Sequence, residues 1–231
     1  MGRPAELTVR RVDFGYFVRP PEETGTGGPR VDPALGYLVS HPQGMILFDT
    51  GMGSHPEVDA YYRIRRIGLP EALAAAGTQV GDIGLAANCH LHFDHCGGNP
   101  LLGAVPVFVQ RAELETARST ANYTLPELID GSRFEQVTGE TELLPGVFLL
   151  PTPGHTDGHQ SLVVRRPDGV VIVAGQTHDT ASGYAADQLA WRADRSGHGQ
   201  PLPAVPAWLD TVQRLDPRLV YFAHDRSVWT P

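Results

Sequence analysis

Three histidines and one aspartate fall within six residues of the stretch 88–96, directly after an apolar segment that predicts a strand. In an extended chain His90 and His92 point to the same side, so both can reach one ion. Once the chain turns, Asp94 and His95 can face a second ion close by. Imidazole nitrogens and carboxylate oxygens are ligands that suit zinc and related divalent metals. A chance cluster of surface or core histidines is the alternative, but this spacing at a strand end favours a metal site.

The elements that must position these residues are mostly short strands. Apolar or alternating runs predict strands at Leu35–Ser40, Met45–Asp49, Leu85–Cys89, Val105–Val109, Val147–Leu150, Ser161–Arg165, Val170–Ala174 and Leu219–Phe222. Turn residues at 41–44 and 166–169 predict two hairpins. Helical patterns are fewer, at Leu69–Ala76, Arg111–Ser119 and Ala207–Leu215. The mixture predicts an α/β protein, and no composition shift divides it, so we expect one domain over residues 1–231.

Two long segments, Arg19–Pro33 and Ala181–Pro206, are expected to be irregular loops, which in a compact domain are usually functional or disordered. Aromatic side chains beside a metal cleft commonly line an apolar pocket. We therefore expect Phe93, Tyr184 and Trp191 to contact a hydrophobic part of the substrate. The alternative for Trp191 is that it only anchors its loop.

Charge and cysteine content exclude several classes of protein. The formal charge is −8 and no basic run exceeds two arginines, which argues against a nucleic-acid groove or an anionic membrane surface. The longest apolar runs are strand-sized, and the first residues contain no apolar secretory segment. Two cysteines make no disulfide framework and suit a reducing compartment. We expect a cytoplasmic protein without a membrane or nucleic-acid partner, acting as a monomer or homodimer.

Four motifs resemble those of a known family, in the same order along the chain. The segment 90–95 matches the pattern H-x-H-x-D-H, and Phe48–Gly51 matches an early D-T-G turn. Thr152–Ser161 is similar to a second histidine motif, and Ala223–Asp225 to a terminal one. This pattern resembles the metallo-β-lactamase superfamily over residues 35–225. The residues of the two histidine motifs look most like those of the N-acyl-homoserine lactone lactonases.

The resemblance implies a four-layer αβ/βα sandwich with a metal site in the cleft between two sheets. One metal would be held by His90, His92 and His155, and the other by Asp94, His95 and His224. Zinc is the implied cofactor, as one or two ions. A metal-bound hydroxide would attack a lactone or ester carbonyl, with Asp94 as the catalytic carboxylate.

Three further residues belong to the expected site. Asp49 is expected to orient a metal-bound imidazole, as such carboxylates do, and His159 to have a supporting, structural role. The family places a bridging aspartate where this chain has Gln176, whose amide offers one neutral carbonyl oxygen to a cation. His178 or Asp179 could compensate for the lost charge. The lactonases' tyrosine is replaced by Asp179, and Tyr184 could substitute for it only if its loop folds back.

The leading hypothesis is a zinc-dependent hydrolase of small lactones or similar esters. A thioesterase like glyoxalase II would use the same metal machinery and is the alternative enzyme. From another class, the loss of the bridging aspartate could mark a metal-binding protein without hydrolytic turnover. Metal analysis with a panel of lactones, thioesters and β-lactams separates the three.

Overall fold

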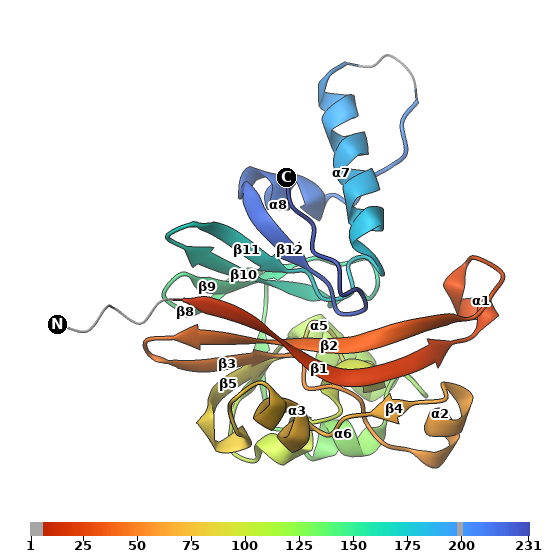
Figure 1. Ribbon diagram of the computed structural model, residues 1–231, viewed down its shortest axis with the longest axis vertical. Helices are drawn as coiled ribbons and strands as arrows, with labels where there is room; N and C mark the ends of the chain where they lie inside the picture. Colours follow the sequence, from red (N-terminus) through yellow and green to blue (C-terminus); the bar gives the residue numbers. More distant parts are fainter. Residues whose placement is uncertain (1–6, 198–200) are drawn as a thin grey trace.

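The computed structural model describes residues 7–197 and 201–231, which form two mixed β-sheets (Figure 1). The larger sheet has the order β4 (Arg65–Arg66), β1 (Thr8–Arg19), β2 (Arg30–His41), β3 (Gly44–Phe48), β5 (Ile83–Ala87), β6 (Val107–Gln110) and β7 (Phe134–Val137). The smaller sheet has the order β12 (Pro217–Tyr221), β11 (Gly169–Val173), β10 (Gln160–Arg166), β9 (Val147–Pro151) and β8 (Thr141–Leu144). All eight predicted strands are present, each within a few residues of its expected bounds, and both predicted hairpins form.

Most of the helices lie on the outer faces of the two sheets, whereas the short helix Pro21–Thr24 lies at the end of the β1–β2 pair (Figure 1). They are α1 (Pro21–Thr24), α2 (Pro56–Tyr61), α3 (Leu69–Ala75), α4 (Phe93–Cys96), α5 (Arg111–Ser119), α6 (Pro126–Asp130), α7 (Ala181–Arg195) and α8 (Trp208–Arg214), with 3-10 turns at Val80–Asp82 and Asn99–Leu102. Helices α3, α5 and α6 lie beside the larger sheet, and α7 and α8 cover the smaller one. Within the described ranges, no helix is both long and apolar enough to cross a bilayer.

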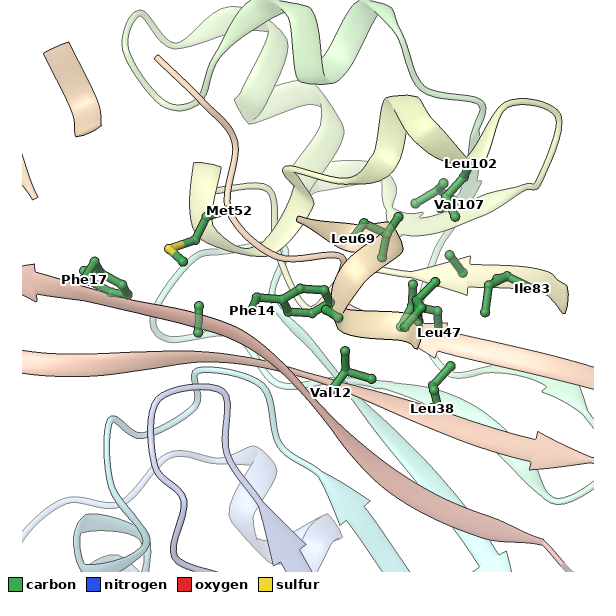
Figure 2. Packing of buried hydrophobic residues seen from close by; sticks show 14 residues of the cluster. Val12, Phe14, Phe17, Leu38, Leu47, Met52, Leu69, Ile83, Leu102 and Val107 are labelled. Atoms are coloured by element: carbon green, nitrogen blue, oxygen red, sulfur yellow. The ribbon is translucent and has the colours of Figure 1, made fainter. Parts of the chain in front are cut away.

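Successive side chains of a strand point to opposite faces of its sheet, so the apolar residues of these strands cover both faces of each sheet. On the larger sheet, Leu38 and Leu47 face outward and pack with Leu69 of α3 (Figure 2). Their neighbours Val39, Ile46 and Phe48 face the other sheet and pack against Leu149, Leu162 and Val173. A third apolar cluster joins the outer face of the smaller sheet to α7 and α8. This layering confirms the predicted αβ/βα sandwich.

Both segments expected to be loops are more regular than predicted. Strand β1 ends at Arg19 and β2 begins at Arg30, so only a short helix and a turn lie between two paired strands. The segment from Ala181 begins with the 15-residue helix α7, and residues 198–200 lie outside the described ranges. The buried face of α7 consists of Ala181, Tyr184 and Gln188. Because one of these residues is a glutamine, the apolar spacing typical of a helix is incomplete in the sequence.

Candidate metal centre

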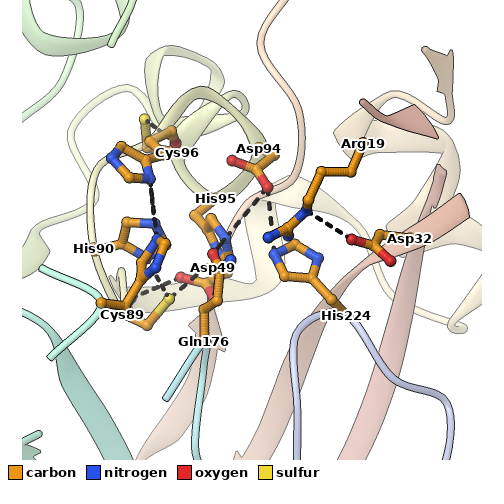
Figure 3. A network of polar contacts seen from close by, with 12 residues as sticks. Arg19, Asp32, Asp49, Cys89, His90, Asp94, His95, Cys96, Gln176 and His224 are labelled. Carbon is orange, nitrogen blue, oxygen red and sulfur yellow. Dashed lines mark hydrogen bonds and ion pairs between the residues drawn. The ribbon is translucent and has the colours of Figure 1, made fainter. Parts of the chain in front are cut away.

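Five strands end at the same edge of the sandwich, and each is followed by a polar residue. Asp49 follows β3, and the histidine cluster follows β5. His155 follows β9, Gln176 follows β11 and His224 follows β12. The fold therefore brings together residues that are up to 175 positions apart in the chain, and Figure 3 shows the central part of the group.

The first cluster consists of three imidazoles whose nitrogens converge on one point. Nε2 of His90 lies 2.9 Å from Nδ1 of His92, and Nε2 of His155 lies 3.2 Å from the same atom. In a tetrahedral site with zinc–nitrogen bonds of about 2.0–2.1 Å, neighbouring ligand nitrogens are roughly 3.3 Å apart. Two of the three nitrogen pairs thus have nearly the spacing that one divalent metal requires, and all three ligand atoms lie within 4.8 Å of one another.

The second cluster contains Asp94, His95 and His224. Oδ2 of Asp94 lies 3.4 Å from Nε2 of His95 and 3.4 Å from Nε2 of His224. Nδ1 of His224 is 2.8 Å from the carbonyl oxygen of Pro33, so this nitrogen carries the ring proton. Its Nε2 is then an acceptor, buried and without a hydrogen-bond partner among the described residues. A lone pair that faces a carboxylate in the interior calls for a cation between them.

Asp49 fixes the orientation of His95. Its Oδ2 accepts from Nδ1 of His95 at 3.1 Å, while its Oδ1 accepts from the backbone N–H of Cys89 at 2.8 Å. The ring proton of His95 is therefore directed away from the cluster, and its Nε2 is left to face Asp94. This is the role expected of a carboxylate behind a metal-bound imidazole.

A third group of ligand types, Cys89, His90 and His95, lies behind these clusters. The thiol Sγ is 3.1 Å from Nδ1 of His90 and 3.3 Å from Nδ1 of His95, on the far side of each ring from the cluster. Burial raises the pKa of the Cys89 thiol well above its usual range, with the carboxylate of Asp49 acting in the same direction. The thiol therefore stays protonated and contributes packing and a weak hydrogen bond.

The side chain of Gln176 has a defined orientation at the second cluster. Its Oε1 lies 3.2 Å from Nε2 of His95, and its Nε2 donates to Oδ1 of Asp179 at 3.3 Å. Its backbone N–H donates to Nε2 of His159 at 3.1 Å, and Nδ1 of His159 is 3.1 Å from the carbonyl oxygen of Thr152. The carbonyl end of the amide consequently faces the site. His159 supports the backbone of Gln176 and does not orient one of the candidate ligand imidazoles.

Gly175 makes this close packing possible. It has a φ of +59°, and a Cβ there would come within 2.5 Å of Cβ of Cys89 and 2.9 Å of Nε2 of His159. Any other residue would displace the backbone that positions Gln176.

The two candidates for replacing the missing carboxylate are engaged elsewhere. Asp179 pairs with Arg19 at 3.3 Å and with Arg30 at 2.7 Å. Nε2 of His178 lies 3.0 Å from Oδ2 of Asp187 on α7. Neither side chain joins the two clusters, so the clusters contain one carboxylate, that of Asp94.

Charge states at the site favour cation binding. Burial lowers the pKa of His92 to about 4 and that of His155 to about 3, so both rings are neutral at pH 7. Burial alone would raise the pKa of Asp94, but the adjacent His95 and His224 outweigh it and hold the pKa below its ordinary value. Neutral His92 and His155 beside an ionised Asp94 are in the protonation states that metal ligands need. The pKa of His95 is raised despite its burial, because Cys89 and the carboxylates of Asp94 and Asp49 favour its charged form, so a cation at the second cluster would have to displace this proton.

A cleft of about 620 Å³ opens over the site. His92, Asp94, His155 and Gln176 line it, and its apolar wall includes three aromatic rings, Phe17, Tyr62 and Phe93. Phe93 stacks on Tyr62 with ring centroids 5.0 Å apart and meets Phe17 edge to face at 6.2 Å. The expected place of Phe93 agrees with this geometry. Phe17 and Tyr62 were not anticipated, because only tertiary structure brings them beside the histidine motif.

The expected pocket roles of Tyr184 and Trp191 are wrong, since neither residue lines this cleft. Tyr184 is fully buried against Phe222 and Trp229, and its hydroxyl accepts from Gln213. Nε1 of Trp191 donates to Asp210 of α8 at 3.3 Å. The physical reason is that their segment is a helix on the outer face of the smaller sheet and does not fold back over the metal ligands.

Glu113 is a buried carboxylate that sequence reasoning missed. Its Oε1 accepts from the backbone N–H of Leu91 at 2.8 Å and from the hydroxyl of Tyr123. Its Oε2 accepts from the hydroxyl of Thr156 at 2.7 Å. Leu91 lies between two ligands and Thr156 follows His155, so one side chain ties together the loops of the first cluster. In the sequence it is simply one glutamate of a predicted helix.

The chain is similar to known proteins over most of its length. A family model described as the metallo-beta-lactamase superfamily matches residues 29–224. An N-acyl homoserine lactonase of a Bacillus species is 35% identical, over 87% of this chain and 85% of that protein. The N-acyl homoserine lactonase of Bacillus cereus is 29% identical, over 84% of this chain and 81% of its own.

Solved structures show the same fold. A quorum-quenching N-acyl homoserine lactone hydrolase superimposes with a TM-score of 0.74 at 24% identity, covering 98% of this chain and 95% of that one. The dizinc quorum-quenching lactonase AidC has a TM-score of 0.61 at 18% identity, covering 75% and 72%. The match over residues 29–224 and the lactonase relative at 35% identity show that the chain belongs to the metallo-beta-lactamase superfamily, and within it to the N-acyl homoserine lactonase family.

Proposed function

We propose that this chain hydrolyses N-acyl homoserine lactones, with zinc held by two groups of ligands. His90, His92 and His155 form the first, and Asp94, His95 and His224 form the second, with the carbonyl oxygen of Gln176 beside it. The observation that carries the proposal is the buried Nε2 of His224, which lies 3.4 Å from the Asp94 carboxylate and has no hydrogen-bond partner among the described residues. The nitrogen-rich ligand set supports zinc as the metal.

When bound, zinc supplies a Lewis acid that makes a water molecule more acidic and polarises the lactone carbonyl. The chain's own contribution is to fix the ligands and shape the cleft. Asp49 and Glu113 hold the ligand loops from behind. The carboxylate of Asp94 lines the cleft, where it can accept a proton from the attacking water and return it to the ring oxygen that leaves.

The aromatic wall of the cleft suits the acyl chain of such a substrate. Phe17, Tyr62 and Phe93 offer apolar surface directly beside His92 and Asp94. An acyl chain on this wall would leave the lactone ring at the ligands. The alternative of a glyoxalase II-like thioesterase gains no support from the relatives, which are lactonases.

The formal charge of −8 supports a small-molecule substrate without nucleic acid as a partner. Both cysteines are free and buried, in keeping with a place in the reducing cytoplasm. The single domain expected over residues 1–231 and the monomer or homodimer remain part of this proposal.

The test is a substrate panel on zinc-loaded protein, with acyl homoserine lactones of different chain length, a glutathione thioester and a β-lactam. We expect turnover of the lactones and little of the others. Preferential turnover of the thioester would support the alternative enzyme. Stoichiometric zinc without turnover of any substrate would identify a metal-binding protein that is not a hydrolase.

A further inference from the structure

Arg19, the last residue of β1, extends into the cleft beside the metal ligands (Figure 3). Its side chain is 11% exposed, and it lines the same cavity as His92, Asp94 and Gln176. No step proposed above uses it. A cationic side chain next to a site that binds cations is electrostatically unfavourable unless an anionic group pairs with it.

Two carboxylates hold the guanidinium in place. Nε of Arg19 lies 2.8 Å from Oδ2 of the buried Asp32, and its Nη1 lies 3.3 Å from Oδ1 of Asp179. The group also lies over the ring of Phe17, with Cζ 5.8 Å from the centroid. Its third nitrogen, Nη2, makes no hydrogen bond to any residue in the ranges 7–197 and 201–231. The side chain is thus fixed with one donor group left over.

Arg30 shows what a purely structural arginine does in the same network. Its Nε lies 2.6 Å from Asp32 and its Nη2 lies 2.7 Å from Asp179, so it shares both carboxylates with Arg19. Arg30 does not line the cleft over the metal ligands. The two arginines therefore differ in one respect, since only Arg19 lines the space where substrate would lie.

The neighbours of Arg19 on the cleft side carry little buried negative charge that would repel an anion. Gln176 is neutral, and its amide nitrogen is directed to Asp179. Asp94 is the one carboxylate that lines the cleft from within the ligand clusters. The other acidic residues of the lining, Glu23, Glu57 and Glu127, are exposed.

Lactone hydrolysis creates an anion in this place. Water adds to the carbonyl carbon, the ring carbon–oxygen bond breaks, and the leaving oxygen takes a proton to become a hydroxyl. The new carboxylic acid loses its proton to solvent at neutral pH, so the product carries one negative charge that the lactone lacks. A guanidinium nitrogen donates a strong hydrogen bond to such a carboxylate.

We propose that Arg19 recognises this carboxylate, with Nη2 donating to the carbonyl oxygen of the lactone as it becomes a carboxylate oxygen. This inference rests on the proposed function for the identity of the anion. It makes Arg19 a residue that contacts the reacting group and Asp32 and Asp179 the residues that position it. It also predicts that the ring-opened product binds more tightly than a neutral analogue of the same length.

The test measures binding of N-hexanoyl-homoserine, and of its neutral primary amide, to zinc-loaded wild type and variants by calorimetry. Arg19→Gln should weaken carboxylate binding roughly 10- to 100-fold, the range for a lost hydrogen bond to a charged group, and change amide binding less than about threefold. Arg30→Gln is the matched control and should leave both affinities within about threefold. Arg19→Lys keeps the charge and the ion pair but loses the fork, so its carboxylate affinity should be intermediate.

Equal weakening by Arg19→Gln and Arg30→Gln, or equal loss for carboxylate and amide, would show that Arg19 only supports the fold. If Arg19→Gln does not fold, Arg19→Lys with unchanged carboxylate affinity overturns the inference, as does a wild type that binds the carboxylate no better than the amide. Failure of the proposed function has a different outcome: wild type would not hydrolyse lactones, while the difference between the two arginine variants would still be measurable.

Discussion

Oε1 of Gln176 lies 3.2 Å from Nε2 of His95, and the nitrogen of the same amide donates to Asp179. Because Asp179 engages the nitrogen, the amide presents its oxygen to the second cluster. A cation at Asp94, His95 and His224 would thus meet one carboxylate and one neutral oxygen. The second cluster therefore has less negative charge to balance this cation than it would have with a second carboxylate.

Replacing Gln176 by Asp should therefore increase metal retention. We expect a higher metal-to-protein ratio after dialysis, measured by elemental analysis, because a carboxylate supplies an anionic oxygen beside His95. Gln176→Leu, which removes the oxygen, should lower the ratio. An unchanged ratio in both variants would mean that the side chain at position 176 makes no contact with the metal.

Glu113 should control the affinity of the first cluster although it does not touch the metal. Glu113→Gln loses the negative charge and one of the two acceptor oxygens that hold the Leu91 and Thr156 loops. We expect zinc affinity to fall roughly 10- to 100-fold, the range for partners that orient ligands. Glu115→Gln, an exposed neighbour on α5, is the control. Equal zinc affinity in the two variants would contradict the role assigned to Glu113.

Substitutions of Trp191 and Phe93 should have different effects, the first on stability and the second on substrate specificity. Trp191 joins α7 to α8 through Asp210, so Trp191→Ala should lower the free energy of unfolding by about 2 kcal/mol. It should leave the dependence of KM on acyl chain length unchanged. Phe93→Ala removes part of the aromatic wall and should raise KM more for long chains than for short ones. An altered chain-length dependence in Trp191→Ala would refute this assignment.

The stability of the metal-free protein should depend on pH through His92. Burial holds the pKa of His92 at about 4, below the value of about 6.5 for an unfolded chain. Between these values the unfolded chain takes up a proton that the folded protein does not. The free energy of unfolding should therefore fall as pH falls through this window, by about 1.4 kcal/mol per pH unit for this group.

Denaturant unfolding of chelated protein at several pH values measures this dependence. His92→Gln removes the titrating group and should show a shallower pH slope than wild type. Identical slopes would show that the imidazole of His92 is not held neutral by the fold.

The candidate metal ligands can be recognised in the sequence because they lie in short motifs at strand ends. His90, His92, Asp94 and His95 are neighbours in the chain, and the spacing itself limits where their side chains can point. His155 and His224 came from the family resemblance, and the structure brings both to the clusters. The eight strands were predictable because their apolar periods are set by burial on one or both faces.

The residues that support the ligands could not be predicted in this way. Arg19 and Glu113 act through hydrogen bonds and ion pairs with residues between 10 and 160 positions away, and nothing in their local sequence marks them. Tyr184 was misplaced because α7 carries a polar residue, Gln188, on its buried face. Such contacts depend on how the layers pack, which local periodicity does not encode.

The most direct test of the metal centre is a zinc titration of chelated protein, following bound metal and hydrolysis of N-hexanoyl homoserine lactone together. We predict no turnover without metal, and a rate that rises with zinc and saturates by about two equivalents. His92→Ala should fail to fill the first cluster and lose turnover by at least about 100-fold, whereas His41→Ala, at the β2–β3 turn, should match wild type. Lactone hydrolysis at the wild-type rate by fully chelated protein, or full metal content in His92→Ala, would contradict the account.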